Sequence, residues 1–199
     1  MAKALASGDA RLMRKAGLEA DLARLERLAA AHYDDQFAVK RAIDRAEREI
    51  AGAERQIPLI EADIASRQPT KGDAFVLRRD KGDLTEREKA GSWLLSQVRL
   101  AAKNGEAGVW NLGRIGGFAV MCEAGPGRRV RGEKRAVDVT LFMEARSGRI
   151  EIAVEDDTKG LGLTSRLEHA LLRIDDALRD AIRMREEAQH RLPSYRARL

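Results

Sequence analysis

The sequence predicts an α+β protein in which a long antiparallel two-helix coiled-coil arm carries a small inserted β-α-β-β-β-β head. Two observations predict this class. Apolar residues recur at alternating spacings of four and three in both terminal segments, whereas the middle is rich in glycine and has short runs with period-two alternation. We therefore divide the chain into a first coiled-coil helix over 9–66, an α/β head over 72–158 and a returning coiled-coil helix over 164–192.

A single heptad register fits the first helix, and charged residues fill the positions between its core residues. Pro58 interrupts the run, but the seam keeps its phase on both sides, so we expect a kink there and not a stop. The core positions are Leu18, Leu22, Leu25, Ala29, His32, Gln36, Val39, Ile43, Ala46, Ile50, Ala53, Ile57, Ile60 and Ile64.

Two polar residues, His32 and Gln36, occupy adjacent layers of this seam. Polar side chains in a coiled-coil seam fix its register at a cost in stability, or mark the point where the partner helix ends. A functional site at these residues is the alternative, and we prefer the structural interpretation.

The returning helix is expected to begin at a cap, Thr164 or Ser165, and to run until Pro193. Its length is about 42 Å at a rise of about 1.5 Å per residue. If it returns antiparallel, it covers the first helix from about Ile64 back to about Val39. The seam over 18–32 is then left for another partner, for which a second copy of the chain is one candidate. The apolar positions of the returning helix are Leu167, Leu171, Ile174, Leu178, Ala181, Ala188 and Leu192.

The head contains one helix and several short strands. A capping box from Thr85 to Glu88 predicts a helix that runs to about Lys103. Turn residues then separate four runs of alternating character, and the Ser147-Gly148 pair predicts a tight turn between the last two. The expected strands are 109–112, 118–122, 137–143 and 150–154, with a further strand at 75–77 ahead of the helix.

Composition narrows the setting in which the chain works. Lys and Arg number 37 against 32 Asp and Glu, and this net charge of +5 is compatible with an anionic partner, nucleic acid first. Cys122 is the only cysteine, so an intramolecular disulfide is excluded. The N-terminal residues lack the apolar stretch of a signal peptide and no segment has the length of a membrane span, so we expect a cytoplasmic protein without a membrane partner.

Residues near the N-terminus resemble a known family. The runs Lys3-Ala4-Leu5-Ala6-Ser7-Gly8-Asp9, Lys15-Ala16-Gly17-Leu18-Glu19-Ala20-Asp21-Leu22 and Leu25-Glu26-Arg27-Leu28 are similar to the stretch that follows the helicase core in very large plasmid- and phage-borne proteins. Those proteins join a superfamily 2 helicase, of Swi/Snf or DEAD-box type, to a DNA adenine methylase. The later Gly113-Arg114-Ile115-Gly116-Gly117-Phe118 stretch and the closing helix also resemble the tail of these proteins.

The resemblance implies that this chain is an accessory C-terminal segment of an ATP-dependent helicase. ATP, Mg²⁺ and the methyl donor would then bind upstream, and no cofactor is expected in the chain itself. The sequence agrees in one respect, because it has no Gly-Lys dipeptide and therefore no Walker A loop. DNA and the lobes of the helicase core would be its partners. The uncovered N-terminal seam, and not the resemblance, suggests a homodimer as a further association.

Candidate catalytic groups have structural alternatives that we prefer. His32, His169 and His190 lack metal-ligand spacing. Cys122 alternates with apolar residues on a strand and is expected to be a buried thiol and not a nucleophile. The acidic run Glu155-Asp156-Asp157 lacks the acid-x-Lys arrangement of a nuclease and is expected to be a solvated loop. Neither a catalytic residue nor a metal site is predicted.

The strongest candidate site is a basic, glycine-rich loop between two predicted strands. Such a loop can contact phosphates of a nucleic-acid backbone, whereas a charged hairpin loop that serves solubility is the alternative. We thus expect DNA backbone binding and spacing of the motor, with a coiled-coil interaction or dimerisation module without nucleic-acid contact as the other hypothesis. The predicted nucleic-acid-binding residues are Arg128, Arg129, Arg131, Lys134 and Arg135.

Overall fold

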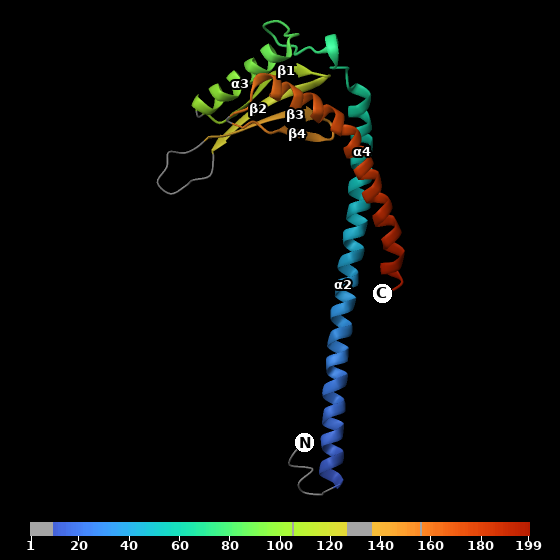
Figure 1. Cartoon of the computed structure of the whole chain (residues 1–199). Helices are drawn as coiled ribbons and strands as arrows, with labels where there is room; N and C mark the ends of the chain where they lie inside the picture. Colours follow the sequence, from blue (N-terminus) through green and yellow to red (C-terminus); the bar gives the residue numbers. More distant parts are fainter. Residues whose placement is uncertain (1–9, 105, 127–136, 156) are drawn as a thin grey trace. The chain divides into compact units, whose positions relative to one another are not determined.

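The computed structural model describes residues 10–104, 106–126, 137–155 and 157–199, and it confirms the α+β class (Figure 1). In these ranges no helix is long and apolar enough to cross a membrane. The elements are α2 (Ala10–Ser66), η1 (Gly72–Ala74), α3 (Arg87–Asn104), β1 (Gly108–Ile115), β2 (Phe118–Pro126), β3 (Val137–Ala145), β4 (Gly148–Ile152) and α4 (Gly160–Arg196).

The chain divides into two compact units. The sheet unit comprises Ala53–Arg183, and the helix-pair unit comprises Met1–Gly52 together with Met184–Leu199. The helices α2 and α4 each contribute to both units, whereas α3 and the four strands belong to the sheet unit alone.

The sheet is an antiparallel meander in the order β1-β2-β3-β4. Gly116 and Gly117 connect β1 to β2, and both have positive φ, 57° and 91°. Such a two-residue turn matches the right-handed twist of the strands, and its backbone favours glycine. The predicted tight turn between the last two strands is also present, with Ala145 paired to Gly148.

One face of the sheet carries the core of this unit. The helix α3 packs against β2 and β3 on that face, and α4 contributes Leu163, Leu167 and Leu171 to the same cluster. Cys122 lies in this cluster, and its burial raises the pKa of the thiol. The prediction that Cys122 is a buried thiol is therefore confirmed.

Two glycines allow α3 and the start of α4 to approach at backbone distance. A Cβ atom at Gly91 would lie 1.9 Å from the carbonyl oxygen of Gly160, and a Cβ at Gly160 would lie 2.5 Å from Ser92 Oγ. Any side chain here would push the two helices apart, so glycine is required at both crossing positions.

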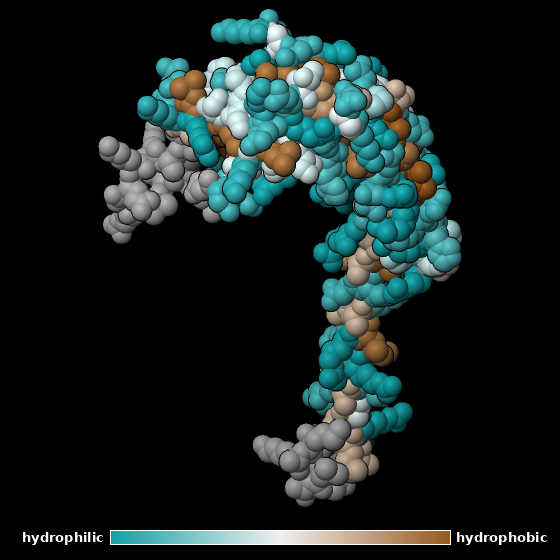
Figure 2. Space-filling model, turned by 45° about the horizontal axis from the view of Figure 1, so that its top comes forward, coloured by the Kyte–Doolittle hydropathy of each residue, from teal (hydrophilic) through white to brown (hydrophobic). Residues whose placement is uncertain are grey.

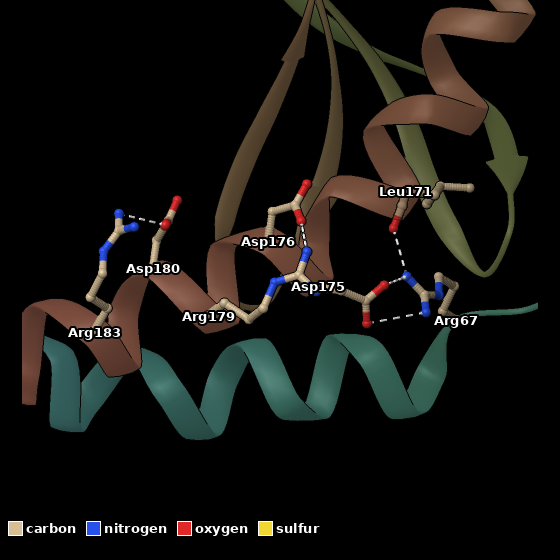
Figure 3. Close-up of polar contacts among 7 residues, drawn as sticks. All are labelled: Arg67, Leu171, Asp175, Asp176, Arg179, Asp180 and Arg183. Carbon is tan, nitrogen blue, oxygen red and sulfur yellow. Dashed lines mark hydrogen bonds and ion pairs between the residues drawn. The ribbon is translucent and has the colours of Figure 1, made fainter.

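Polar clamps hold the helices of the sheet unit to one another and to the sheet. Arg67 donates from Nη1 to the Leu171 carbonyl oxygen (2.8 Å) and to Asp175 Oδ2 (2.7 Å), as Figure 3 shows. Buried Asp63 accepts hydrogen bonds from the backbone N–H groups of Arg146 and Ser147, both at 2.9 Å. This carboxylate fixes the β3–β4 turn to the last turns of α2.

Three sequence predictions require correction. Residues 75–77 form no named strand: Leu77 makes only an isolated bridge to Leu84. The described part of the head therefore begins with helices, and its strands all follow α3. Thr164 does not cap α4, which begins at Gly160. Its hydroxyl donates within the helix to the Leu161 carbonyl oxygen (3.0 Å), a bond that Ser and Thr form inside helices.

The third correction concerns the end of α4, which continues past Pro193 to Arg196. A proline within a helix removes one donor, and near the C-terminus few bonds remain downstream to be disturbed. The continuation of α2 through Pro58, in contrast, is as predicted.

The helix-pair unit contains two antiparallel helical segments. Ion pairs join Glu49 to Arg191 (3.0 Å), Glu47 to Arg196 (2.8 Å) and Asp35 to Arg198 (3.1 Å). Successive residues of the C-terminal segment thus pair with progressively earlier residues of α2, which shows that the two segments are antiparallel. The predicted seam positions Val39 and Ala46 are buried, as is Ala188 of α4.

Candidate nucleic-acid interface

The predicted basic residues Arg128, Arg129, Arg131, Lys134 and Arg135 lie outside the described residues. The described strand ends show where their segment attaches, because Pro126 of β2 pairs with Val137 of β3.

A second basic group, which the sequence did not single out, lies beside the edge strand β1. Arg78 and Arg114 form an isolated antiparallel bridge in which each backbone N–H donates to the other residue's carbonyl oxygen at 2.9 Å. Residues paired in this way project their side chains to the same side, with Cβ atoms about 5 Å apart. The side chains of Arg78 and Arg114 therefore leave the backbone next to each other and on the same side.

Local backbone structure explains this approach. The buried side chains of Phe75 and Leu77 anchor the segment that carries Arg78. Register along β1 shifts between Asn111 and Gly113, which is a β-bulge. Gly113 has φ of 130°, and a Cβ atom there would lie 2.3 Å from the Arg78 carbonyl oxygen. Glycine at the bulge thus lets the two arginine-bearing segments pair.

The charges of Arg78 and Arg114 are not compensated within the described ranges. Both side chains are exposed, and neither makes an ion pair with a described carboxylate. Arg114 Nη2 donates only to the carbonyl oxygen of Gly117, at 2.8 Å. Like charges directly opposite one another on paired strands are destabilising. An anion bound between them would relieve that repulsion.

Other arginines of the sheet unit are used differently. Arg87 donates to both carboxylate oxygens of Glu168 (3.0 and 3.1 Å) and to the Thr70 carbonyl oxygen (2.7 Å). Arg67 is held by Asp175 in the same two-pronged manner. These arginines join elements of the fold, whereas Arg78 and Arg114 keep their charge available at the surface.

Two hollows flank the arginine pair, and Arg78 and Arg114 line both. One, of about 610 Å³, is also lined by Gln68 and the Gly116–Gly117 turn. The other, of about 540 Å³, contains further donors and an aromatic ring, with Asp80 as its acidic member. Its remaining lining residues are Arg79, Lys81, Trp93, Gln97, Asn111, Leu112 and Gly113.

Arg79 and Trp93 form a stacked pair in the second hollow. The Arg79 guanidinium lies 4.5 Å from the centre of the Trp93 ring, and its Nε donates to the Gly82 carbonyl oxygen at 3.0 Å. Stacked arginine keeps its outer N–H groups available to an anion, while the ring holds the side chain in place. The hollow therefore contains a positively charged guanidinium whose position is fixed by the Trp93 ring and the Gly82 carbonyl oxygen.

Arg114 projects from the sheet face opposite the core, because its partner Ala119 lies between the buried Phe118 and Val120. Over β3 and β4, however, this face has the wrong character for a nucleic acid. Phe142 on that face is buried beneath Arg149, whose guanidinium lies 4.4 Å from the ring centre and also pairs with Glu123. Glu144 and Glu151 lie on the same face, because they are the cross-strand neighbours of Arg149 and Phe142 respectively, and both carry negative charge. RNA-binding sheets instead expose aromatic rings on such a face.

Arg114 lies beside the first end of β2, whereas the predicted basic residues follow its last residue, Pro126. Arg114 pairs with Ala119, and Pro126 is the last described residue before the segment that contains the predicted basic residues. At a rise of about 3.3 Å per residue, Ala119 and Pro126 lie about 23 Å apart.

Among the residues that the structure describes, no group of three or more His, Cys, Asp or Glu side chains could hold a metal ion. Glu155 of the acidic run pairs with Arg166 at 3.0 Å, while Asp156 lies outside the described residues. His32, His169 and His190 are all exposed.

Comparisons with known proteins leave the family open. No protein-family model, no curated protein and no solved structure matches the chain.

Proposed function

We propose that the chain is a non-catalytic accessory module that binds the sugar-phosphate backbone of DNA through its sheet unit. The observation that carries this proposal is the bridged pair Arg78 and Arg114, which has no described carboxylate partner. Contacts to phosphate oxygens position a protein on DNA without reading its sequence. Binding by this pair should therefore depend weakly on base sequence.

The two hollows support a binding path for the DNA backbone along the arginine pair, because Arg78 and Arg114 line both of them. Phosphates would lie against Arg78 and Arg114, with Lys81 and the stacked Arg79 as further cationic contacts. The loop that contains Arg128, Arg129 and Arg131 is proposed as a second contact. The distance of about 23 Å between Ala119 and Pro126 along β2 corresponds to about seven base pairs of a duplex at about 3.4 Å each.

The resemblance of residues 3–28 suggests the setting for this binding. As an accessory segment of a superfamily 2 helicase, the chain would hold DNA while ATP is hydrolysed in the helicase core. The long helix α2 would set the spacing of the motor, and the core lobes would be protein partners.

The experiment is a salt titration of DNA binding by fluorescence anisotropy. The double variant Arg78→Gln/Arg114→Gln should bind unrelated duplexes more weakly, and its plot of log affinity against log salt should be flatter by about 1.8 for two lost phosphate contacts. The charge-matched control is Arg99→Gln/Lys103→Gln, which changes exposed residues of α3 outside both hollows.

Equal slopes for the double variant and the wild type would refute the arginine-pair site. The triple variant Arg128→Ala/Arg129→Ala/Arg131→Ala tests the loop in the same titration. If wild-type protein shows no salt-dependent binding to single-stranded or duplex DNA, the DNA-binding proposal itself is wrong.

A protein-interaction module without nucleic-acid contact is the second candidate. The observation in its favour is the exposed leucine seam of α2, in which Leu18, Leu22 and Leu25 are 57–64% exposed. Retained self-association with absent DNA binding would select this candidate.

A further inference from the structure

The N-terminal part of α2 has an apolar stripe that the described residues do not cover. Leu18, Leu22 and Leu25 are 64%, 57% and 63% exposed, although they continue the seam that is buried at Val39 and Ala46. Figure 2 shows brown and tan residues along this part of α2 among hydrophilic ones. We propose that residues 11–36 of α2 pair with the same segment of a second copy of the chain, in antiparallel orientation.

The width of the stripe indicates that its partner is a helix. Leu18, Leu22, Leu25 and Ala29 follow spacings of four and three, and exposed charged residues occupy most of the positions between them, with exposed Leu28 at the edge of the stripe. A stripe centred on two heptad positions is the narrow seam of a coiled coil, whereas a helix that packs on a globular surface has a broader apolar face.

The length of the uncovered seam favours a second copy and sets its direction. Within the helix-pair unit the buried seam starts at Val39. In the antiparallel register Leu22 faces Leu25 of the second copy, and Leu18 faces its Ala29. Arg11 of one copy then lies opposite Gln36 of the other, so the paired segments end before Val39.

A parallel pair would not be confined to the uncovered part of α2. Two parallel copies in register would remain side by side past residue 36 and meet the buried positions Val39 and Ala46. Those positions share the helix-pair unit with Ala188 of α4, which is itself fully buried. The antiparallel pair uses about 26 residues of each helix, or about 39 Å at about 1.5 Å per residue.

Charge also favours the antiparallel orientation. A parallel pair would place Arg11 and Lys15 of one copy against the same seam residues of the other. The antiparallel pair instead brings Arg14 of each copy beside Asp35 of its partner. Asp35 already pairs with Arg198, but both side chains remain more than half exposed. The facing pair Glu19 and Glu26 is unfavourable, as is the corresponding Asp21 and Glu26 pair in the parallel arrangement.

Sedimentation equilibrium of the full chain over a range of concentrations tests the association. Wild type should shift from monomer mass towards dimer mass as concentration rises. Leu22→Glu should remain monomeric, because it places an unpaired carboxylate in the seam against Leu25 of the other copy. The control Ala20→Glu adds the same charge on the opposite, exposed face of the helix and should associate like wild type. The proposal would be overturned if the wild-type chain stays monomeric, or if Leu22→Glu and Ala20→Glu lose dimerisation to the same extent.

Orientation is tested by disulfide trapping, since the natural Cys122 is buried. A tagged Leu18→Cys chain is mixed with an untagged Ala29→Cys chain and oxidised. The antiparallel pair should give the mixed product, a disulfide between position 18 of one chain and position 29 of the other, which the tag distinguishes by mass. Predominant homotypic products would show a parallel pair and contradict the inference. This test does not depend on DNA binding.

Discussion

Removing the Asp63 carboxylate should destabilise the sheet unit, because it is the shared acceptor for two backbone donors. Asp63 is 1% exposed, and its oxygens accept from Arg146 N and Ser147 N at 2.9 Å each. A hydrogen bond to a charged group contributes about 1.5–3 kcal/mol, and its donor is left unsatisfied when the acceptor is removed. Water can partly replace the acceptor at this surface turn, so we expect a loss of about 3 kcal/mol for Asp63→Ala.

The assay is thermal and urea unfolding followed by tryptophan fluorescence. Trp93 and Trp110 are the only tryptophans, and both belong to the sheet unit, so the signal reports on that unit. A loss of about 3 kcal/mol corresponds to a Tm lowered by about 6–12 °C for a chain of this size.

The matched control is Glu61→Gln, an exposed carboxylate in the same helix, which should change stability by less than about 0.5 kcal/mol. Asp63→Asn should fall between the two, because its amide keeps one acceptor oxygen but presents an N–H₂ group to the other donor. An Asp63→Ala variant that melts within about 1 °C of wild type would refute the assigned role of the carboxylate.

Three further changes test other contacts of the fold by the same unfolding assay. Gly91→Ala should destabilise the sheet unit by about 3 kcal/mol or more, because its Cβ would lie 1.9 Å from Gly160 O; wild-type stability would contradict the close crossing. Arg87→Lys should cost about 2 kcal/mol, since lysine cannot donate at once to Glu168 and the Thr70 carbonyl; a neutral change would show that the fork geometry is unimportant. The hydrogen bond from Arg67 lowers the pKa of Asp175, so the contribution of the pair is present above about pH 4 and lost as pH falls through the lowered pKa. Asp175→Asn should therefore cost about 0.5–1 kcal/mol at pH 7, the low value reflecting the 42% exposure of the carboxylate, and should match wild type in strong acid; a difference that persists there would be inconsistent with this ion pair.

Elements defined by periodicity could be predicted closely from the sequence. The first helix was expected over 9–66 and is described over Ala10–Ser66. The first three strands after α3 appear at the expected places with longer bounds, and the fourth lies at Gly148–Ile152, two residues earlier than expected. Errors occurred where tertiary contacts decide the local structure. Residues 75–77 alternate like a strand, but Leu77 alone among them pairs, through an isolated bridge to Leu84. The helix α4 begins before Thr164 because Gly160 packs directly on α3.

The candidate site shows the same limit. Composition pointed to a basic loop, because clustered charges are visible in a linear sequence. Arg78 and Arg114 are far apart along the chain, and each stands next to residues that predict only strands and turns. Their pairing requires the bulge in β1 and the positive φ of Gly113, neither of which is a local property of the arginines.

By itself the sequence determined the α+β class, the extent of the first helix and the burial of Cys122, because periodicity and alternation follow from the geometry of single helices and strands. The tertiary structure decided which charges are compensated. Arg67 and Arg87 are used in clamps to Asp175 and Glu168, while Arg78 and Arg114 are placed side by side without a described carboxylate. Side-chain charge is encoded residue by residue, but whether it is neutralised depends on distances between segments remote in sequence, which only the folded chain sets.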